Sequence, residues 1–170
     1  MIELLLALVG FAFVSSITPG PNNLMLMASG ANFGFGRTIP HMLGISVGHS
    51  FMIIMVGLGL IQLFDAFPVL HRIMSALSIT YLLYLAWKIA NAAPPSEGEA
   101  RGTPLTFFQA AAFQWVNPKA WFMALTAITV YAPDQTILAI AAVALVFAMT
   151  NLPSICTPRT VQVQMDGRLV

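Results

Sequence analysis

The stretch Ser16-Ile17-Thr18-Pro19-Gly20-Pro21-Asn22 interrupts an apolar run that starts at Ile2 and continues almost to Phe35. Its prolines remove backbone donors and clash with the preceding helical turn, and its glycine loosens what remains. A membrane span needs about 20 apolar residues, so the run is too long for one simple span. The sequence predicts a retained membrane helix broken here, with a short apolar arm over residues 24–31. A cleaved signal peptide is the alternative for the start of this run.

The composition places the chain in a membrane. Hydrophobic residues make up 58% of the 170 residues and charged residues 8%, against about a quarter charged in an ordinary globular domain. The mean hydropathy is +0.84. Seven basic and six acidic residues leave a net charge of +1, which provides no basic surface for nucleic acid. The single cysteine, Cys156, excludes an internal disulfide framework and a cysteine-based zinc site. A soluble enzyme, a disordered protein and a nucleic-acid binder are therefore excluded.

Four further apolar segments complete the predicted all-α membrane fold of five transmembrane helices. They cover residues 40–64, 69–90, 104–131 and 136–152, and the third is interrupted by Asn117-Pro118-Lys119. Prolines and charges mark residues 93–102 as a water-exposed loop. The predicted organisation is a first three-helix repeat over residues 1–91, an exposed loop over 92–104, an incomplete second repeat over 105–155 and a polar tail over 156–170.

The two broken helices form the basis of an internal repeat. Each half opens with a Phe-rich helix that breaks at a proline, and Pro21 corresponds to Pro118. Because each half would hold an odd number of helices, the second half would enter the membrane in the opposite orientation. This predicts an inverted 3+3 repeat, provided that a sixth helix completes it. Interrupted helices at matching places in two halves point to the substrate site of a transporter.

The broken ends carry groups that suit an amino acid. One new helix end has unpaired N–H groups, which favour a carboxylate, and the other has unpaired C=O groups, which favour an ammonium. Asn22, Asn23 and Asn117 add neutral donors and acceptors. Lys119 adds a positive charge whose burial costs at least about 2.5–3.5 kcal/mol. We expect the two breaks to meet near the midplane and to form a site from Pro19, Gly20, Pro21, Asn22, Asn117, Pro118 and Lys119.

Structural explanations for the same residues stay open. Proline breaks can be packing kinks, Lys119 can extend to an interface, and His49 can be a hydrogen-bonded interior residue rather than a proton carrier. Gly44 and Gly48 predict a small-residue face for close helix packing. Their segment matches G-x-S-x-G, but a nucleophile elbow needs a strand-turn-helix context. His41 and His49 have no nearby carboxylates, so no metal site is expected.

Two motifs in matching order resemble signatures of the LysE/RhtB superfamily of amino acid exporters. Residues 16–22 resemble the first, and Gln114-Trp115-Val116-Asn117-Pro118-Lys119-Ala120-Trp121 resembles the second. Residues 81–88 and 151–154 also match, so the likeness covers about residues 1–155. The resemblance implies six helices, proton-coupled export of an amino acid or a derivative, and a place in the bacterial inner membrane. With the second motif, Gln114 joins the predicted site, and Lys119 and His49 are the candidates for proton coupling.

The chain departs from the superfamily near its end, where it turns polar after Ile155 instead of forming a sixth apolar helix. A reading-frame shift near Ser154 would produce such a tail. We expect a secondary transporter rather than an enzyme, without a cofactor or metal. Its expected partners are an amino acid, protons and the lipid bilayer, with no nucleic acid, and a homo-oligomer is compatible with these features. The alternative is a non-functional truncated fragment or a non-transporting membrane scaffold.

Overall fold

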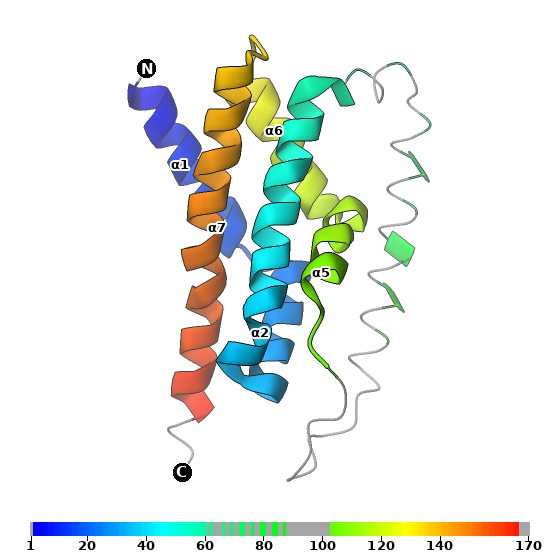
Figure 1. Cartoon of the computed structure of the whole chain (residues 1–170), viewed down its shortest axis with the longest axis vertical. Helices are drawn as coiled ribbons and strands as arrows, with labels where there is room; N and C mark the ends of the chain where they lie inside the picture. Colours follow the sequence, from blue (N-terminus) through cyan, green and yellow to red (C-terminus); the bar gives the residue numbers. More distant parts are fainter. Residues whose placement is uncertain are drawn as a thin grey trace.

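The computed structural model describes residues 2–60 and 103–166, with scattered positions between residues 62 and 87; for residues 152–166 it describes the backbone alone. Every element in these parts of the chain is helical, which confirms the all-α prediction (Figure 1). The elements are α1 (Ile2–Ile17), α2 (Pro21–Met55), the π-helical turn η1 (Val56–Leu60), α5 (Phe107–Phe113), the 3₁₀ turn η2 (Gln114–Val116), α6 (Pro118–Tyr131) and α7 (Ile137–Asp166). The predicted helix over 69–90 and the loop over 92–104 lie almost entirely outside the described residues.

The predicted first break separates α1 from α2. Gly20 is extended, with φ −166° and ψ 179°, and Pro21 is the first residue of α2. A proline is tolerated at this position because the first N–H groups of a helix have no partner within the helix. The helical hydrogen bonds stop at Thr18, whose N–H donates to Val14 O, and resume at Leu24, whose N–H donates to Gly20 O. The break therefore has the local cause that the sequence predicts.

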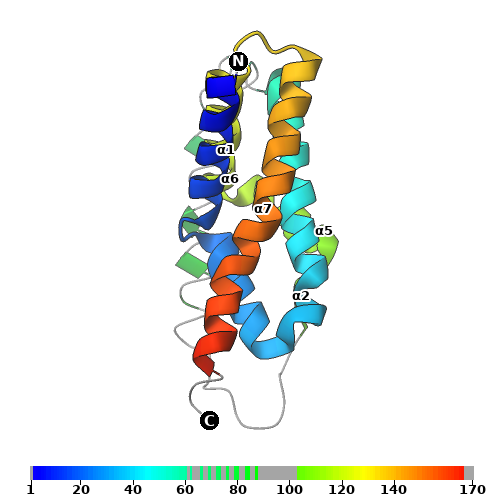
Figure 2. The same cartoon turned by 90° about the vertical axis from the view of Figure 1, so that its left-hand side faces the viewer.

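Within α2, the chain bends sharply at Gly34. This residue has φ 74° and ψ 174°, so two helical arms meet there, and Figure 2 shows them lying as a bent pair at one end of the molecule. The hydroxyls of Ser29 and Thr38 join the arms at 3.0 Å. The sequence predicts a short arm over residues 24–31 and a separate segment that starts at residue 40. Pro40 instead lies inside the helix, which membrane helices tolerate where neighbouring groups satisfy the freed backbone.

Replacing Gly34 by alanine should destabilise the bend. Its dihedral angles lie in a region that only glycine adopts readily, and strain of this kind costs of order 1–3 kcal/mol. A Cβ at Gly34 would meet nothing within 4 Å, so the effect would come from the backbone alone. We expect a lower midpoint in thermal unfolding of the purified protein. Gly36→Ala is the matched control, because Gly36 is equally uncrowded and has no positive φ. Equal melting of the two variants would contradict the prediction.

The predicted second break lies between α5 and α6. Thr106 and Gln109 form a capping box that starts α5, with bonds of 3.0 and 3.3 Å between each backbone N–H and the other side chain. After the turn η2, Asn117 is extended at φ −89° and ψ 109°. Its side-chain oxygen accepts from the backbone N–H of Lys119 at 3.1 Å and so caps α6. The interruption predicted at residues 117–119 is confirmed.

One predicted helix changes its helix type before its predicted end, and another extends beyond its predicted end. The segment predicted to be helical to residue 64 leaves regular α-helix at Met55 and continues as the π-helical η1, within which Gly59 has φ 126°. The segment predicted to end at residue 152 continues as α7 to Asp166. Pro153 does not end α7, and the sequence contains no glycine between residue 137 and Gly167. The change from apolar to polar residues was therefore not a change of secondary structure.

Helix α7 packs between α1 and the second arm of α2 (Figure 2). Its fully buried Phe147 meets the ring of Phe11 at 6.1 Å and that of His49 at 5.2 Å, both edge to face. Ser46 and Ser50 of α2 each donate a hydrogen bond of 3.3 Å to a backbone carbonyl of α7. These contacts hold His49 at the centre of the packed helices.

The second arm of α2 also packs closely on α5. A Cβ at Gly44 would lie 2.3 Å from Phe107 O, and a Cβ at Gly48 would lie 2.6 Å from Ala111 Cα. Side chains larger than hydrogen therefore do not fit at either position without moving backbone atoms. The predicted small-residue face is confirmed, as is common where membrane helices approach closely.

The surface of the described part is apolar while several polar residues lie inside. Leu6, Val47 and Phe122 are 65%, 52% and 64% exposed, whereas Asn23, Gln114 and Asn117 are buried. Among the described residues, one helical stretch, Pro21–Leu60, has the length and composition to cross a membrane, and Ile2–Ile17 and Ile137–Asn151 are shorter apolar helices. An apolar exterior around a polar interior suits a lipid surrounding.

Candidate functional site

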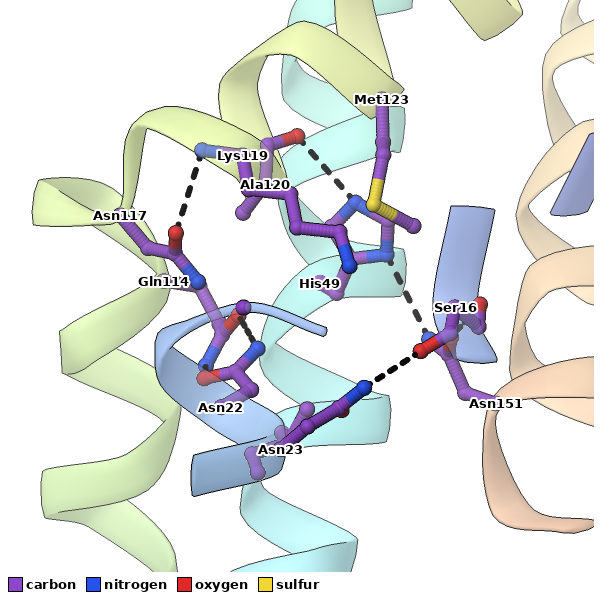
Figure 3. Close-up of a pocket in the computed structure, with 12 residues that line it drawn as sticks. Ser16, Asn22, Asn23, His49, Gln114, Asn117, Lys119, Ala120, Met123 and Asn151 are labelled. Carbon is purple, nitrogen blue, oxygen red and sulfur yellow. Dashed lines mark hydrogen bonds between the residues drawn. The ribbon is translucent and has the colours of Figure 1, made fainter. Parts of the chain in front are cut away.

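The two helix breaks lie against each other. The side-chain amides of Asn22, after the first break, and Gln114, before the second, bond reciprocally at 2.8 and 3.2 Å (Figure 3). The ammonium of Lys119 donates to the backbone carbonyl of Thr18. Gly20 allows this approach, because a Cβ there would lie 2.7 Å from Lys119 Cδ. Segments about a hundred residues apart in sequence are thus joined by three polar contacts.

A pocket lies at this junction. Its cavity volume is about 30 Å³, which is room for roughly one or two water molecules. The lining comes from the helices α1, α2, α6 and α7, the turn η2 and both breaks, and its residues are Ser16, Gly20, Asn22, Asn23, Ile45, His49, Gln114, Asn117, Lys119, Ala120, Met123 and Asn151. Ten of them are labelled in Figure 3. The pocket is smaller than an amino acid in this conformation, so a ligand of that size would require it to widen.

The carbonyl end of α1 is already occupied by groups of the protein. The amide nitrogen of Asn23 lies 3.1, 3.3 and 3.0 Å from the carbonyl oxygens of Ser16, Ile17 and Thr18. The ammonium of Lys119 adds a second donor to Thr18 O. Asn23 also lines the pocket, and in this conformation its side-chain nitrogen satisfies the end of the broken helix, where carbonyls have no partner within the helix.

A chain of hydrogen bonds at the pocket connects four helices, α1, α7, α2 and α6. Ser16 Oγ donates to Asn151 Oδ1 at 2.6 Å, and Asn151 Nδ2 lies 3.4 Å from His49 Nδ1. His49 Nε2 lies 3.3 Å from the carbonyl of Ala120. Because Nδ1 faces an amide donor and Nε2 faces a carbonyl, the network fits a neutral imidazole protonated on Nε2. In this conformation His49 is therefore an interior residue with both ring nitrogens hydrogen-bonded. This is one of the two alternatives that the sequence leaves open.

Lys119 gives the pocket its formal charge. No aspartate or glutamate is among the residues that line the pocket. Lys119 is half-buried, and its side chain turns towards the first break instead of extending away from it, as an interfacial lysine would. The described residues contain no group of three His, Cys, Asp or Glu side chains placed to hold a metal. The chemistry of the pocket is therefore that of neutral amides, backbone carbonyls and one cation.

The structure brings most of the predicted site residues together. Gly20, Asn22, Gln114, Asn117, Lys119 and His49 line the pocket. Pro19, Pro21 and Pro118 are not among the lining residues, although two of them are the first residues of α2 and α6. The prediction missed Ser16, Ile45, Ala120, Met123 and Asn151. Ser16, Ala120 and Asn151 lie within the stretches 16–22, 114–121 and 151–154 that resemble the superfamily, which is the signal that could have found them.

Comparison with known proteins assigns the chain to a family. Residues 6–156 match the family LysE type translocator. The cysteine/O-acetylserine efflux protein of Salmonella typhimurium is 29% identical over 126 residues, and that of Escherichia coli K12 is 30% identical over 128 residues. Each alignment covers 74% of this chain and 64% of the relative.

The chain spans about 64% of the length of these curated relatives. No solved structure matches the chain. The family match covers both helix breaks and every residue that lines the pocket. The chain belongs to the LysE type translocator family, a family of membrane transporters rather than enzymes.

Proposed function

We propose that this protein exports a small amino acid with an uncharged side chain, such as cysteine, or a close derivative such as O-acetylserine, across the bacterial inner membrane. The observation that carries the proposal is the junction of the two breaks around a pocket with a single lysine. The efflux relatives supply the substrate class, since their names specify cysteine and O-acetylserine. A zwitterion without a further charge suits a pocket that contains no carboxylate.

The pocket would serve as the central site of alternating access. Gly20, Asn22, Gln114, Asn117 and Lys119 would surround the backbone of the substrate, and the apolar side chains of Ile45 and Met123 would contact its side chain. Because the cavity is about 30 Å³, entry of the substrate would separate the Asn22 and Gln114 amides. The broken helices would then move relative to each other, which is how transporters with interrupted helices alternate between their two open states.

Coupling to the proton gradient is part of the proposal. Lys119 and His49 are the titratable residues that line the pocket; Lys119 contacts the first break, and His49 belongs to the network with Asn151. Protonation of His49 would add a second donor facing the Asn151 amide, so this contact would have to reorganise. The inverted repeat, which the matching positions of the two breaks suggest, its completion by a sixth helix and assembly with a second copy are further proposals.

An export assay tests the proposed function. The chain would be expressed in a bacterial strain that lacks its own exporters of cysteine and O-acetylserine, and both compounds would be measured in the medium by mass spectrometry. We expect a higher extracellular concentration of at least one of them than with an empty vector, together with greater resistance to added cysteine. The proposal fails if the protein reaches the membrane but a panel of all proteinogenic amino acids shows no change. A non-transporting membrane protein would then be the better description.

A further inference from the structure

We propose that the side chain of Lys119 mimics the substrate when the pocket is empty. Its ammonium occupies the position at Thr18 O that the α-ammonium of the substrate occupies during transport. The inference rests on the proposed function and specifies how the same pocket recognises its ligand. The substrate class would be amino acids that carry both a free α-ammonium and a free α-carboxylate, without an additional positive charge.

The position of the Lys119 ammonium is the first argument. Helix α1 ends at Ile17, and its last carbonyls form the negative end of a helix dipole, a place that favours cations. Lys119 contacts Thr18 O there, although it belongs to the first turn of α6. A cation in the first turn of a helix is disfavoured by that helix's own dipole. The Lys119 side chain thus extends from the N-terminus of α6, which disfavours a cation, to the C-terminus of α1, which favours one.

The charge balance of the pocket is the second argument. A zwitterion brings one positive and one negative group, while the pocket residues supply one cation and no carboxylate. If the substrate ammonium takes Thr18 O, the released Lys119 has the substrate carboxylate as its partner. An amine without a carboxylate would give Lys119 no new partner. Its ammonium and that of Lys119 would then compete for the carbonyl of Thr18. A basic amino acid would add a positive charge for which the pocket residues provide no counter-ion.

Gly20 provides the third argument, because the close approach of Lys119 depends on the absence of a side chain there. A Cβ at Gly20 would lie 2.7 Å from Lys119 Cδ and 3.2 Å from Nζ. These atoms belong to the flexible end of the lysine, so an alanine would displace the ammonium without removing its charge. Gly20 has an extended backbone that alanine can also adopt. Gly20→Ala is therefore a way to remove the ammonium from Thr18 O while the lysine stays in the protein.

The test is binding of n-propylammonium, a bare ammonium, to the purified full chain in lipid nanodiscs. In the native protein the Lys119 ammonium and the Asn23 amide both donate to Thr18 O, so we expect no measurable binding by calorimetry at millimolar concentrations. Lys119→Met removes the lysine donor from Thr18 O and leaves only the Asn23 amide there, and we expect an apparent Kd at least about tenfold lower, the effect of a favourable helix-end charge interaction. The same Kd in the native protein and in Lys119→Met would overturn the inference.

Two further variants keep the test decisive if Lys119→Met does not fold. Gly20→Ala should also gain n-propylammonium binding, while Gly10→Ala, at a glycine of α1 with nothing within 4 Å, should behave like the native protein. No gain in Gly20→Ala, or an equal gain in Gly10→Ala, would overturn the inference. The assay does not involve transport, so its result is separate from the export assay. A gain of ammonium binding without export of any amino acid would support the local inference and refute the proposed function.

Discussion

Replacing Lys119 by alanine is expected to lower export to the level of an empty vector, a loss of at least about tenfold. Lys119 is the charged residue that lines the pocket, and in the proposed cycle it binds the substrate carboxylate. Charge-assisted hydrogen bonds of this kind contribute about 1.5–3 kcal/mol, which corresponds to roughly tenfold or more in affinity. Rates of cysteine and O-acetylserine export, normalised to the amount of protein in the membrane, measure the effect.

Arg37→Ala is the matched control for this prediction. It also removes one positive charge, but Arg37 is exposed beside the bend at Gly34, where its guanidinium lies 5.9 Å from the ring centre of Phe33. Its export should stay close to that of the native protein. Normal export by Lys119→Ala would contradict a role for the lysine in the site. The contact with Thr18 would then be a way of satisfying the end of α1 and nothing more.

The parts of the site that depend on local sequence could be predicted. Pro21 and Pro118 lack a backbone N–H, so each can start a helix but cannot continue one, and the structure places both at the first position of a helix. The small residues Gly44 and Gly48 likewise predict a close helix contact from their spacing alone. For these features, the covalent structure of single residues determines the local geometry, whichever helix lies opposite.

The features that depend on packing could not be predicted. Asn23 looks like a ligand-binding amide in the sequence, but the nearby carbonyls at the end of α1 use its donor. The contact between Asn151 and His49 joins residues 102 positions apart, and no spacing rule connects them. Helix α7 extends beyond the predicted end at residue 152, because the loss of hydrophobicity there does not end the helix. Polarity determines where a helix can lie relative to lipid, whereas glycine and capping residues determine where it ends.

Alanine at Gly44 or Gly48 is expected to destabilise the protein strongly. A Cβ at Gly44 would lie 2.3 Å from Phe107 O, and a Cβ at Gly48 would lie 2.6 Å from Ala111 Cα. These are backbone atoms of α5, so the clash cannot be relieved by a change of rotamer and α5 must move away from α2. Overpacking of this kind costs typically about 1–3 kcal/mol. We expect a lower midpoint in thermal unfolding and less protein in the membrane for each variant.

The same displacement should reach the pocket. Helix α5 leads directly into Gln114, whose amide bonds to Asn22 across the two breaks, so moving α5 would stretch that pair. Export should therefore fall by more than the loss of protein alone explains. Gly10→Ala and Gly36→Ala are the controls, since a Cβ at either position would meet nothing within 4 Å. If all four alanine variants melt alike, close packing at Gly44 and Gly48 does not hold α5 in place. If export per molecule stays normal in the destabilised variants, the position of α5 does not control the Asn22–Gln114 contact.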